Sequence, residues 1–368
     1  MSTIRVAHVL HAFGFGGLEK GIATLIRHGS ADFEHLILCL AKTGESESLL
    51  PYGTQLLELH KKEGSSLRFF VDLSRKLRAL KPDVVHTRNW GGIDGVIAAN
   101  LAGMRRCVVQ GEHGWGMEDA FGKSAKRVWI RRLLSLGVRE FTCVSKQMES
   151  WLQGEVKVFA PVSQIYNGID TSLFSPEGKK AALRHELGLK ASTKLIGSIG
   201  RLDPIKDHVG LIQAFQEVHQ SCPDCALIIV GNGPERERLE AMSTPGVYFL
   251  GARYEVAQIL RDMDIFALAS INEGISNTIL EAMATGLPVV STNVGGTPEL
   301  ITHEYNGLLA EPRDHGQLAS YLLTYLQAPA MRAEHGQHNR RITQERFSIE
   351  AMVQGYELVW SRISGKKS

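Results

Sequence analysis

The chain has 368 residues, which is enough for two domains of ordinary size. Hydrophobic residues make up 43% of it and charged residues 22%, a balance typical of a globular protein in water. A net charge of +2 gives no reason to expect nucleic acid as a partner. No apolar run approaches the roughly 18 residues of a membrane span, and no signal-peptide pattern stands at the N-terminus. The five cysteines are odd in number and mostly apart, which suits a reducing cytoplasm, and we expect a cytoplasmic protein.

Predicted strands and helices alternate along the whole chain. An apolar strand at 4–10 is followed by a glycine-rich loop at 14–17 and a helix, and the same order restarts at 194–199. Further strand-like runs lie at 35–40, 83–86, 107–110, 140–144, 226–230, 247–250, 264–269 and 289–292. This alternation predicts an α/β protein with parallel sheets, and the restart predicts two doubly wound domains.

The boundary between the two halves is predicted close to Asn167-Gly168, a strong turn signal, with Pro176 discouraging regular structure nearby. We therefore expect one domain over 1–170 and a second over 171–346. The closing stretch, 347–363, has the pattern of a helix.

Cys222 and Cys225 have the spacing of a redox pair or a zinc half-site, and His219 precedes them. The sequence holds no second pair of this kind, and the intervening Pro-Asp is ordinary turn chemistry between a helix and a strand. We expect neither a metal nor a redox function from these cysteines.

The most informative window is 270–286, which directly follows a predicted strand. Glu273 and Glu281 lie eight residues apart, on either side of a predicted helix start that includes Ser276. The first turn of a helix offers N–H groups to negative charge, and carboxylates accept hydroxyl groups. A nucleotide-sugar, with its diphosphate, ribose and hexose, meets both kinds of group. The alternative is an acidic helix cap plus a solvated helix glutamate.

Two other predicted strand ends carry glycine-rich loops. Gly14 to Gly17 would let backbone amides approach a phosphate, because glycine adopts positive φ and has no side chain; the alternative is plain packing. The turn 230–234 would contact a nucleobase or simply reverse the chain.

Charged or titratable side chains follow two more predicted strands. Arg201 and Lys206 would neutralise a diphosphate leaving group, or would be solvated beside Asp203 and Asp207. His113, between glycines, would hydrogen-bond a sugar hydroxyl or carry a proton, or would be satisfied by backbone within its loop.

These motifs occur in the order seen in the retaining glycosyltransferases of family 4, which the chain resembles over nearly its whole length. The matching segments are the loop 14–17, Glu112-His113-Gly114, 167–170, Gly200-Arg201 with Lys206, 230–234, Glu273 with Glu281, 286–290 and 295–300. More narrowly, segments 85–89, 273–283 and 347–353 resemble sugar transferases of bacterial exopolysaccharide systems that accompany PEP-CTERM protein sorting.

The resemblance implies a GT-B fold, in which two Rossmann-like domains face across a cleft and the last helix packs back on the first domain. It also implies sugar transfer from a nucleotide-sugar, UDP being favoured, with retention at the anomeric carbon and with neither metal nor cofactor. The departing phosphate would take the acceptor proton. The implied catalytic residues are His113, Arg201, Lys206 and Glu273. The implied donor-binding residues are Gly16, Gly17, Arg201, Lys206, Asn232, Gly233, Gly274, Ile275, Ser276, Asn277, Thr278 and Glu281.

The acceptor is less well defined, and the resemblance implies a glycan or a lipid-linked sugar. Candidate residues on that side are Trp90, Gly91, Gly92, Trp115 and 117–121. The stretch 120–139 contains no acid, and 123–139 carries six cations with Trp129, Leu133 and Leu136 at helical spacing. It would rest on the anionic inner face of a membrane, or would be a packed helix with a solvated face.

Two other functions fit the same sequence pattern. A nucleotide-sugar 2-epimerase shares the fold and would need no acceptor. A non-catalytic scaffold would bind the nucleotide without turnover.

Overall fold

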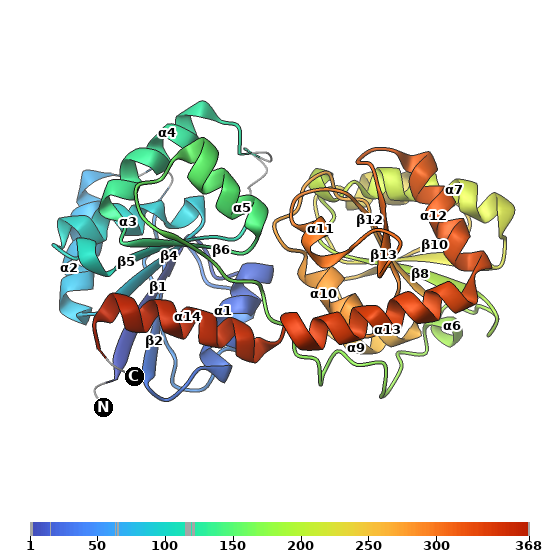
Figure 1. Cartoon of the computed structure of the whole chain (residues 1–368), viewed down its shortest axis with the longest axis horizontal. Coiled ribbons are helices and arrows are strands. Elements are labelled where there is room, and N and C mark those ends of the chain that lie inside the picture. The colour runs from blue at the N-terminus through green and yellow to red at the C-terminus, as the bar shows by residue number, and fades with distance from the viewer. Residues whose placement is uncertain are drawn as a thin grey trace. The chain divides into compact units, whose positions relative to one another are not determined.

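The computed structural model describes residues 3–14, 16–62, 64, 66–114, 119 and 122–366 (Figure 1). The chain divides into two compact units, Met1–Gly168 with Ile349–Ser368 and Ile169–Ser348. These limits lie two residues from the boundaries that the sequence suggested. Among the described residues, no helix combines the length and the apolar character needed to cross a membrane.

The first unit is a parallel seven-stranded sheet with helices on both faces (Figure 1). Its strands, in spatial order, are β3 (Gln55–Glu58), β2 (Phe33–Cys39), β1 (Ile4–Leu10), β4 (Val84–Arg88), β5 (Val108–Glu112), β6 (Glu140–Cys143) and β7 (Val162–Gln164). One face is covered by α1 (Gly17–His28) and α14 (Ile349–Ser364). The other is covered by α2 (Leu67–Leu80), α3 (Ile93–Leu101) and α5 (Lys146–Trp151), and α4 (Ala125–Leu134) precedes β6.

The second unit is a parallel six-stranded sheet, also covered on both faces. Its strands, in spatial order, are β10 (Val247–Gly251), β9 (Cys225–Val230), β8 (Lys194–Ile199), β11 (Ile265–Leu268), β12 (Val289–Thr292) and β13 (Gly307–Ala310). On one face lie α7 (His208–Ser221), α8 (Arg236–Ala241) and α12 (His315–Gln327). On the other lie α9 (Val256–Asp262), α10 (Asn277–Ala284) and α13 (Pro329–Arg346) (Figure 1), while α6 (Leu183–Glu186) and α11 (Thr297–Leu300) are short.

The predicted α/β class with two doubly wound parallel sheets is confirmed. Three strands escaped prediction, namely β3, β7 and β13, and all three lie at an edge of their sheet. β3 and β7 have no fully buried residue. An edge strand packs against a neighbour on one side alone, so it does not need the continuous apolar run by which a central strand is recognised.

Each sheet has one place where the direction of strand order reverses. In the first unit it lies between β1 and β4, and in the second between β8 and β11. In open parallel sheets, ligands bind beyond the carboxyl ends of the strands at such a reversal, because the loops on either side diverge and leave a crevice. The loops after these four strands are therefore the places to look for a site.

Candidate functional site

Two aspartates shape the loop after β8, which carries Arg201 and Lys206. The Asp203 carboxylate accepts a hydrogen bond from the Ile205 amide at 3.1 Å and begins a single turn at Pro204–Lys206. Asp207, with φ of +46°, caps α7 by accepting from the Gly210 amide at 3.1 Å. Both aspartates are therefore N-caps, and Lys206 lies between them at the end of the turn.

Lys206 and Glu273 form an ion pair, although 67 residues separate them. Lys206 Nζ lies 2.5 Å from Glu273 Oε1, and the Ser270 hydroxyl donates to the same oxygen at 2.7 Å. The two side chains are only 20% and 10% exposed. Two residues that the sequence singled out separately are thus joined where the loops after β8 and β11 meet.

Arg201 behaves differently from Lys206. Its side chain is 65% exposed, and its Nε lies 3.7 Å from an Asp203 carboxylate oxygen. The solvated alternative describes Arg201 in this structure and does not describe Lys206. Arg201 is thus largely in water, whereas the Lys206–Glu273 pair is largely buried.

The loop after β12 holds the backbone of Glu273 in place. The Gly296 amide donates to the carbonyl oxygens of Gly274 at 2.9 Å and of Glu273 at 3.3 Å. A Cβ on Gly295 or Gly296 would collide with these same carbonyl groups, and Gly295 also has φ of +57°. Glycine is required here because two backbones approach too closely for any side chain.

Ser276 is the N-cap of α10, so the helix begins where the sequence predicted. Its hydroxyl lies 3.5 Å from the Ile279 amide, and Ser276 itself is buried. Glu281 lies one turn inside the helix and is only 8% exposed. The alternative of an acidic cap and a solvated glutamate is wrong on both counts, because the cap is a serine and Glu281 is buried.

The loop after β9 packs against the loop after β8. The Leu202 amide donates to the Asn232 carbonyl at 3.0 Å, and a Cβ on Gly231 or Gly233 would meet the backbone of residues 200 or 202. Close packing therefore accounts for both glycines. The exposed Asn232 side chain accepts a hydrogen bond from Arg236 Nη1 at 2.5 Å.

In the first unit, the loop at 14–17 differs from its prediction. None of Gly14, Gly16 and Gly17 has a positive φ, and Gly16 is the N-cap of α1 in an extended conformation. A Cβ on Gly16 would collide with the Glu19 carboxylate. Burial raises the pKa of Glu19, and hydrogen bonds from its own backbone amide and that of Gly14 oppose the shift. The plain packing alternative fits the conformation of this loop, and contact with a phosphate stays a prediction.

His113 is fixed by residues that the sequence did not single out as site residues. Arg88 Nη1 donates to His113 Nε2 at 2.9 Å, and the His113 amide donates to Asn89 Oδ1 at 2.6 Å. Arg88 is the last residue of β4 and is 1% exposed. The available signal was a cation ending an otherwise buried strand, next to the predicted strand that carries His113. The candidate acceptor residues Trp115 and 117, 118, 120 and 121 lie outside the described residues.

Three more histidines line up behind Arg88, under α14. His8 Nδ1 accepts from Arg88 Nη2 at 3.3 Å, and His8 Nε2 lies 3.1 Å from His35 Nδ1. The fully buried Trp360 of α14 donates from Nε1 to His86 Nδ1 at 3.0 Å. Burial, and secondarily the charge of Arg88, lowers the pKa of His8, His86 and His113 well below the usual value and that of His35 to about 4.

The cysteine pair shows no sign of reactivity. Cys225 Sγ lies 2.9 Å from the Cys222 carbonyl, and burial raises the pKa of its thiol to about 12. A redox pair or a zinc half-site needs the thiolate, which this environment opposes. No group of three potential metal ligands occurs within the described part of the chain.

Comparison with known proteins agrees with this geometry. The model of "Glycosyltransferase Family 4" matches residues 15–173, and that of "Glycosyl transferases group 1" matches residues 193–328. An Escherichia coli UDP-Gal:alpha-D-GlcNAc-diphosphoundecaprenol alpha-1,3-galactosyltransferase is 32% identical over 261 residues, 67% of each chain. The chain belongs to glycosyltransferase family 4.

Other relatives act on different molecules. A Bacillus anthracis N-acetyl-alpha-D-glucosaminyl L-malate synthase is 28% identical, and the match spans 63% of this chain and 62% of that enzyme. Among solved structures, Anabaena Alr3699/HepE in complex with UDP and glucose has a TM-score of 0.79 at 23% identity, covering 98% of this chain and all of that one. WaaG, a glycosyltransferase involved in lipopolysaccharide biosynthesis, has a TM-score of 0.73 at 18% identity, covering 98% of this chain and 100% of that one. The family 4 chain therefore has the GT-B fold that the sequence predicted.

The neutral histidines predict an acid-labile first unit. The pKa of His35 is about 4 in the folded chain against 6.5 for a free histidine, so the unfolded chain takes up the proton first as pH falls. The contribution of each such histidine to the free energy of unfolding is fully present above pH 6.5. It is lost between pH 6.5 and 4, by about 1.4 kcal/mol per pH unit.

Thermal unfolding between pH 7.5 and 5 checks this expectation. In His35→Asn, the amide oxygen still accepts from His8. The free energy of unfolding should depend on pH more weakly than in the wild-type chain, because about one proton fewer is taken up on unfolding. Equal slopes for the wild-type chain and the variant would show that folding does not lower the pKa of His35 and would contradict this expectation.

Proposed function

We propose that this family 4 chain transfers a sugar from a nucleotide-sugar, UDP-linked by preference, to a glycan or lipid-linked acceptor with retention of anomeric configuration. The observation that carries the proposal is the Lys206–Glu273 pair, which lies between β8 and β11, the reversal point of the sheet, and beside the start of α10. Support comes from a relative named for UDP-Gal and a diphosphoundecaprenol-linked acceptor, and from a neighbour in complex with UDP and glucose.

In the proposed complex, cations face the diphosphate. Lys206 shares its ammonium between Glu273 and the leaving phosphate, and the exposed Arg201 swings in to complete the neutralisation. The first-turn amides of α10 donate hydrogen bonds to the phosphate oxygens, because a helix leaves these N–H groups without intrahelical partners. This arrangement supplies by side chains and backbone what a divalent metal would otherwise supply.

The carboxylates and His113 hold the sugars. Glu281 receives the ribose hydroxyls, and Glu273 with residues 274–278 receives the donor hexose. The family resemblance adds His113 as a contact of the donor sugar. Glu273 Oε1 already accepts from Lys206 and Ser270, which lowers its nucleophilicity and favours a role in holding the ligand over attack on the sugar. The departing phosphate then takes the acceptor proton, so the proposal needs no protein base.

The remaining contacts complete the proposal. Gly16 and Gly17 approach the phosphates, and Asn232 and Gly233 approach the base. The biological setting proposed is exopolysaccharide synthesis of the kind that accompanies PEP-CTERM sorting, on the cytoplasmic side of the membrane.

Nucleotide binding should depend on Glu281. Thermal stabilisation by UDP, GDP and ADP, each alone and with its common sugars, is measured in EDTA. Ligand at 100 times its dissociation constant adds about 2.7 kcal/mol of stability. Glu281→Ala should weaken binding of the effective nucleotide by 1.5–3 kcal/mol, roughly tenfold to a hundredfold, because a charge-assisted hydrogen bond is lost.

Glu345→Ala, at an exposed glutamate of α13, is the control and should bind as the wild-type chain does. Unchanged affinity in Glu281→Ala would remove that residue from the site. A requirement for divalent metal would overturn the metal-free proposal, and conversion of a UDP-sugar without acceptor would indicate the epimerase instead.

Lys206→Met should reduce kcat more than it weakens donor binding, because negative charge grows on the leaving phosphate as the bond to the sugar breaks. We expect a loss of about a hundredfold in kcat. Lys194→Met is the matched control, since Lys194 begins β8 at the opposite edge of the same sheet and pairs with Asp264 at 3.3 Å. Equal losses in kcat and in donor affinity would rule out this role for Lys206.

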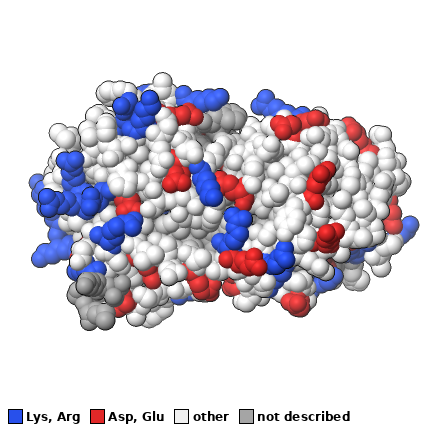
Figure 2. All heavy atoms as spheres, in the orientation of Figure 1, with Lys and Arg blue, Asp and Glu red and all other residues white. Residues whose placement is uncertain are grey.

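We also propose that α4 and the surface beside it rest on an anionic membrane. Trp129 and Leu133 are 66% and 51% exposed, whereas Arg131 between them is buried and paired with Glu112 at 3.0 Å. The alternative of a helix with its apolar residues packed does not fit Trp129 and Leu133. Leu136 and Phe159 continue the exposed apolar surface, and Figure 2 shows Lys and Arg side chains gathered over this part of the first unit.

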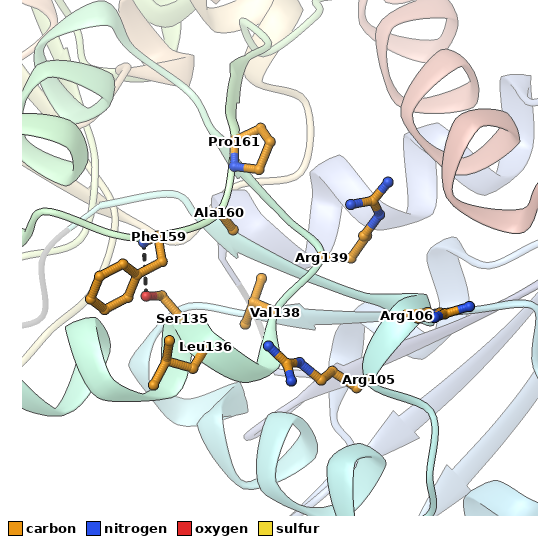
Figure 3. A pocket seen from close by; sticks show the side chains of 9 residues that line it. All are labelled: Arg105, Arg106, Ser135, Leu136, Val138, Arg139, Phe159, Ala160 and Pro161. Atoms are coloured by element: carbon orange, nitrogen blue, oxygen red, sulfur yellow. Dashed lines mark hydrogen bonds between the residues drawn. The ribbon is translucent and has the colours of Figure 1, made fainter.

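A pocket adjoins this surface at the amino ends of β5, β6 and β7 (Figure 3). Leu136 and Phe159 line one side of it, and Arg106 and Arg139 the other, with Arg105 below. No carboxylate among the described residues pairs with these three arginines. Guanidinium groups beside exposed apolar side chains suit lipid phosphates above acyl chains.

Sedimentation with vesicles tests this contact. Binding should require phosphatidylglycerol in the vesicle and should weaken in high salt. The double substitution Trp129→Ser with Leu133→Ser should reduce binding to the vesicles at least tenfold, because these two large apolar side chains no longer enter the bilayer. Leu358→Ser, at a 61% exposed leucine of α14, is the control. Equal binding to neutral vesicles, or none to either kind, would contradict the proposal.

A further inference from the structure

Arg88 is a buried cation that has no counter-charge within the described part of the chain. It is 1% exposed, no carboxylate of the described residues pairs with it, and its Nε has no hydrogen-bond partner there. The face of the Tyr356 ring lies 5.1 Å from the guanidinium carbon. A buried charge of this kind is costly, so the arrangement is expected to serve a purpose other than stability.

We propose that Arg88 is a positioning residue for the transfer reaction, which fixes His113 as a neutral imidazole with its proton on Nδ1. The inference rests on the proposed function in one respect, namely that His113 faces the donor sugar. A guanidinium has donors alone and keeps its proton in proteins. The contact of 2.9 Å between Arg88 Nη1 and His113 Nε2 therefore requires Nε2 to be the acceptor.

The same argument assigns the other histidines. Arg88 Nη2 reaches His8 Nδ1, so the His8 proton lies on Nε2 and is donated to His35 Nδ1. Trp360 Nε1 is also solely a donor, so the His86 proton lies on Nε2 and faces the Thr142 hydroxyl at 3.2 Å. Each contact is consistent with the next, and all four rings are neutral.

The backbone around His113 is built to preserve this contact. Asn89 has φ of +53° and ψ of −172°, a conformation that residues with a side chain rarely adopt, and its Oδ1 accepts from the His113 amide at 2.6 Å. A Cβ added at Gly111 would lie 3.0 Å from His86 Nε2 and 3.2 Å from His113 Nε2, so a side chain there would crowd both rings. Residues at the ends of two adjacent strands thus set the position of the His113 ring, and Arg88 sets its protonation.

The consequence is chemical. A neutral His113 with its proton on Nδ1 donates a hydrogen bond to a sugar hydroxyl from that atom and does not shuttle a proton during the reaction. With Nε2 engaged by Arg88, Nδ1 is the ring nitrogen left for the ligand. Loss of Arg88 would let the ring take either tautomer and rotate.

Nitrogen NMR of the full chain, labelled with ¹⁵N at histidine, tests the assignment without any substrate. The His113 signals are identified by their loss in His113→Ala. At pH 7, Nδ1 should show the shift of a protonated nitrogen and Nε2 that of a bare one. A proton on Nε2, or on both nitrogens, would overturn the inference even if the transferase activity is established.

Variants test whether Arg88 acts through His113. Arg88→Met should mix the two tautomers of His113, whereas Trp360→Phe, the control, should change the His86 signals and leave those of His113 in place. In an active enzyme, Arg88→Met should lower kcat about tenfold, the equivalent of one hydrogen bond. When Arg88→Met is added to the His113→Ala variant, kcat should change by less than about twofold, because the two residues act as one unit.

A tenfold loss in both backgrounds would show a purely structural role for Arg88 and would contradict the proposal. If Arg88→Met does not fold, the wild-type tautomer alone decides. If no donor and acceptor pair is turned over, the proposed function fails, while the tautomer measurement still stands or falls by itself.

Discussion

A parallel sheet brings the carboxyl ends of all its strands to one edge, and the candidate site follows from that constraint. In the second unit, the loops after β8, β9, β11 and β12 meet at this edge and touch one another through their backbones. Glycine pairs at 231 and 233 and at 295 and 296 make the approach close enough. The Lys206–Glu273 pair then forms between two loops whose backbones are joined by a hydrogen bond from the Ile271 amide to the Ile205 carbonyl.

The two units treat buried charge in contrasting ways. In the second, the ammonium of Lys206 has a carboxylate partner, which keeps both groups in place and leaves a short distance for either to move toward a ligand. In the first, Arg131 has Glu112, but Arg88 has histidines and a tyrosine ring. Burial, and secondarily the positive charge of Arg88, lowers the pKa of His113 and His35 below the usual value and keeps both rings neutral. Lys206 in the second unit and Arg88 in the first are thus both cations held largely away from water.

Sequence and structure agree best in the strands of the sheet centres. Continuous apolar runs made ten strands recognisable, and turn and capping residues such as Ser276 placed the helix start of the site correctly. The edge strands β3 and β7 were missed because their partly exposed residues form no such run. The glycines at 14–17, which the sequence marked as able to adopt positive φ, do not use that freedom, and Gly16 is extended.

By itself, the sequence determined the order and type of the elements, the two doubly wound halves and the residues that follow each strand, because these depend on local periodicity and turn chemistry. The tertiary structure alone decided which of these residues meet. Lys206 pairs with Glu273 and not with Asp203 or Asp207, Arg88 reaches His113 across two strands, and Trp129 is exposed while Arg131 is buried. Partners in space depend on strand order and on the packing of loops from distant parts of the chain, and no spacing along the sequence encodes either of them.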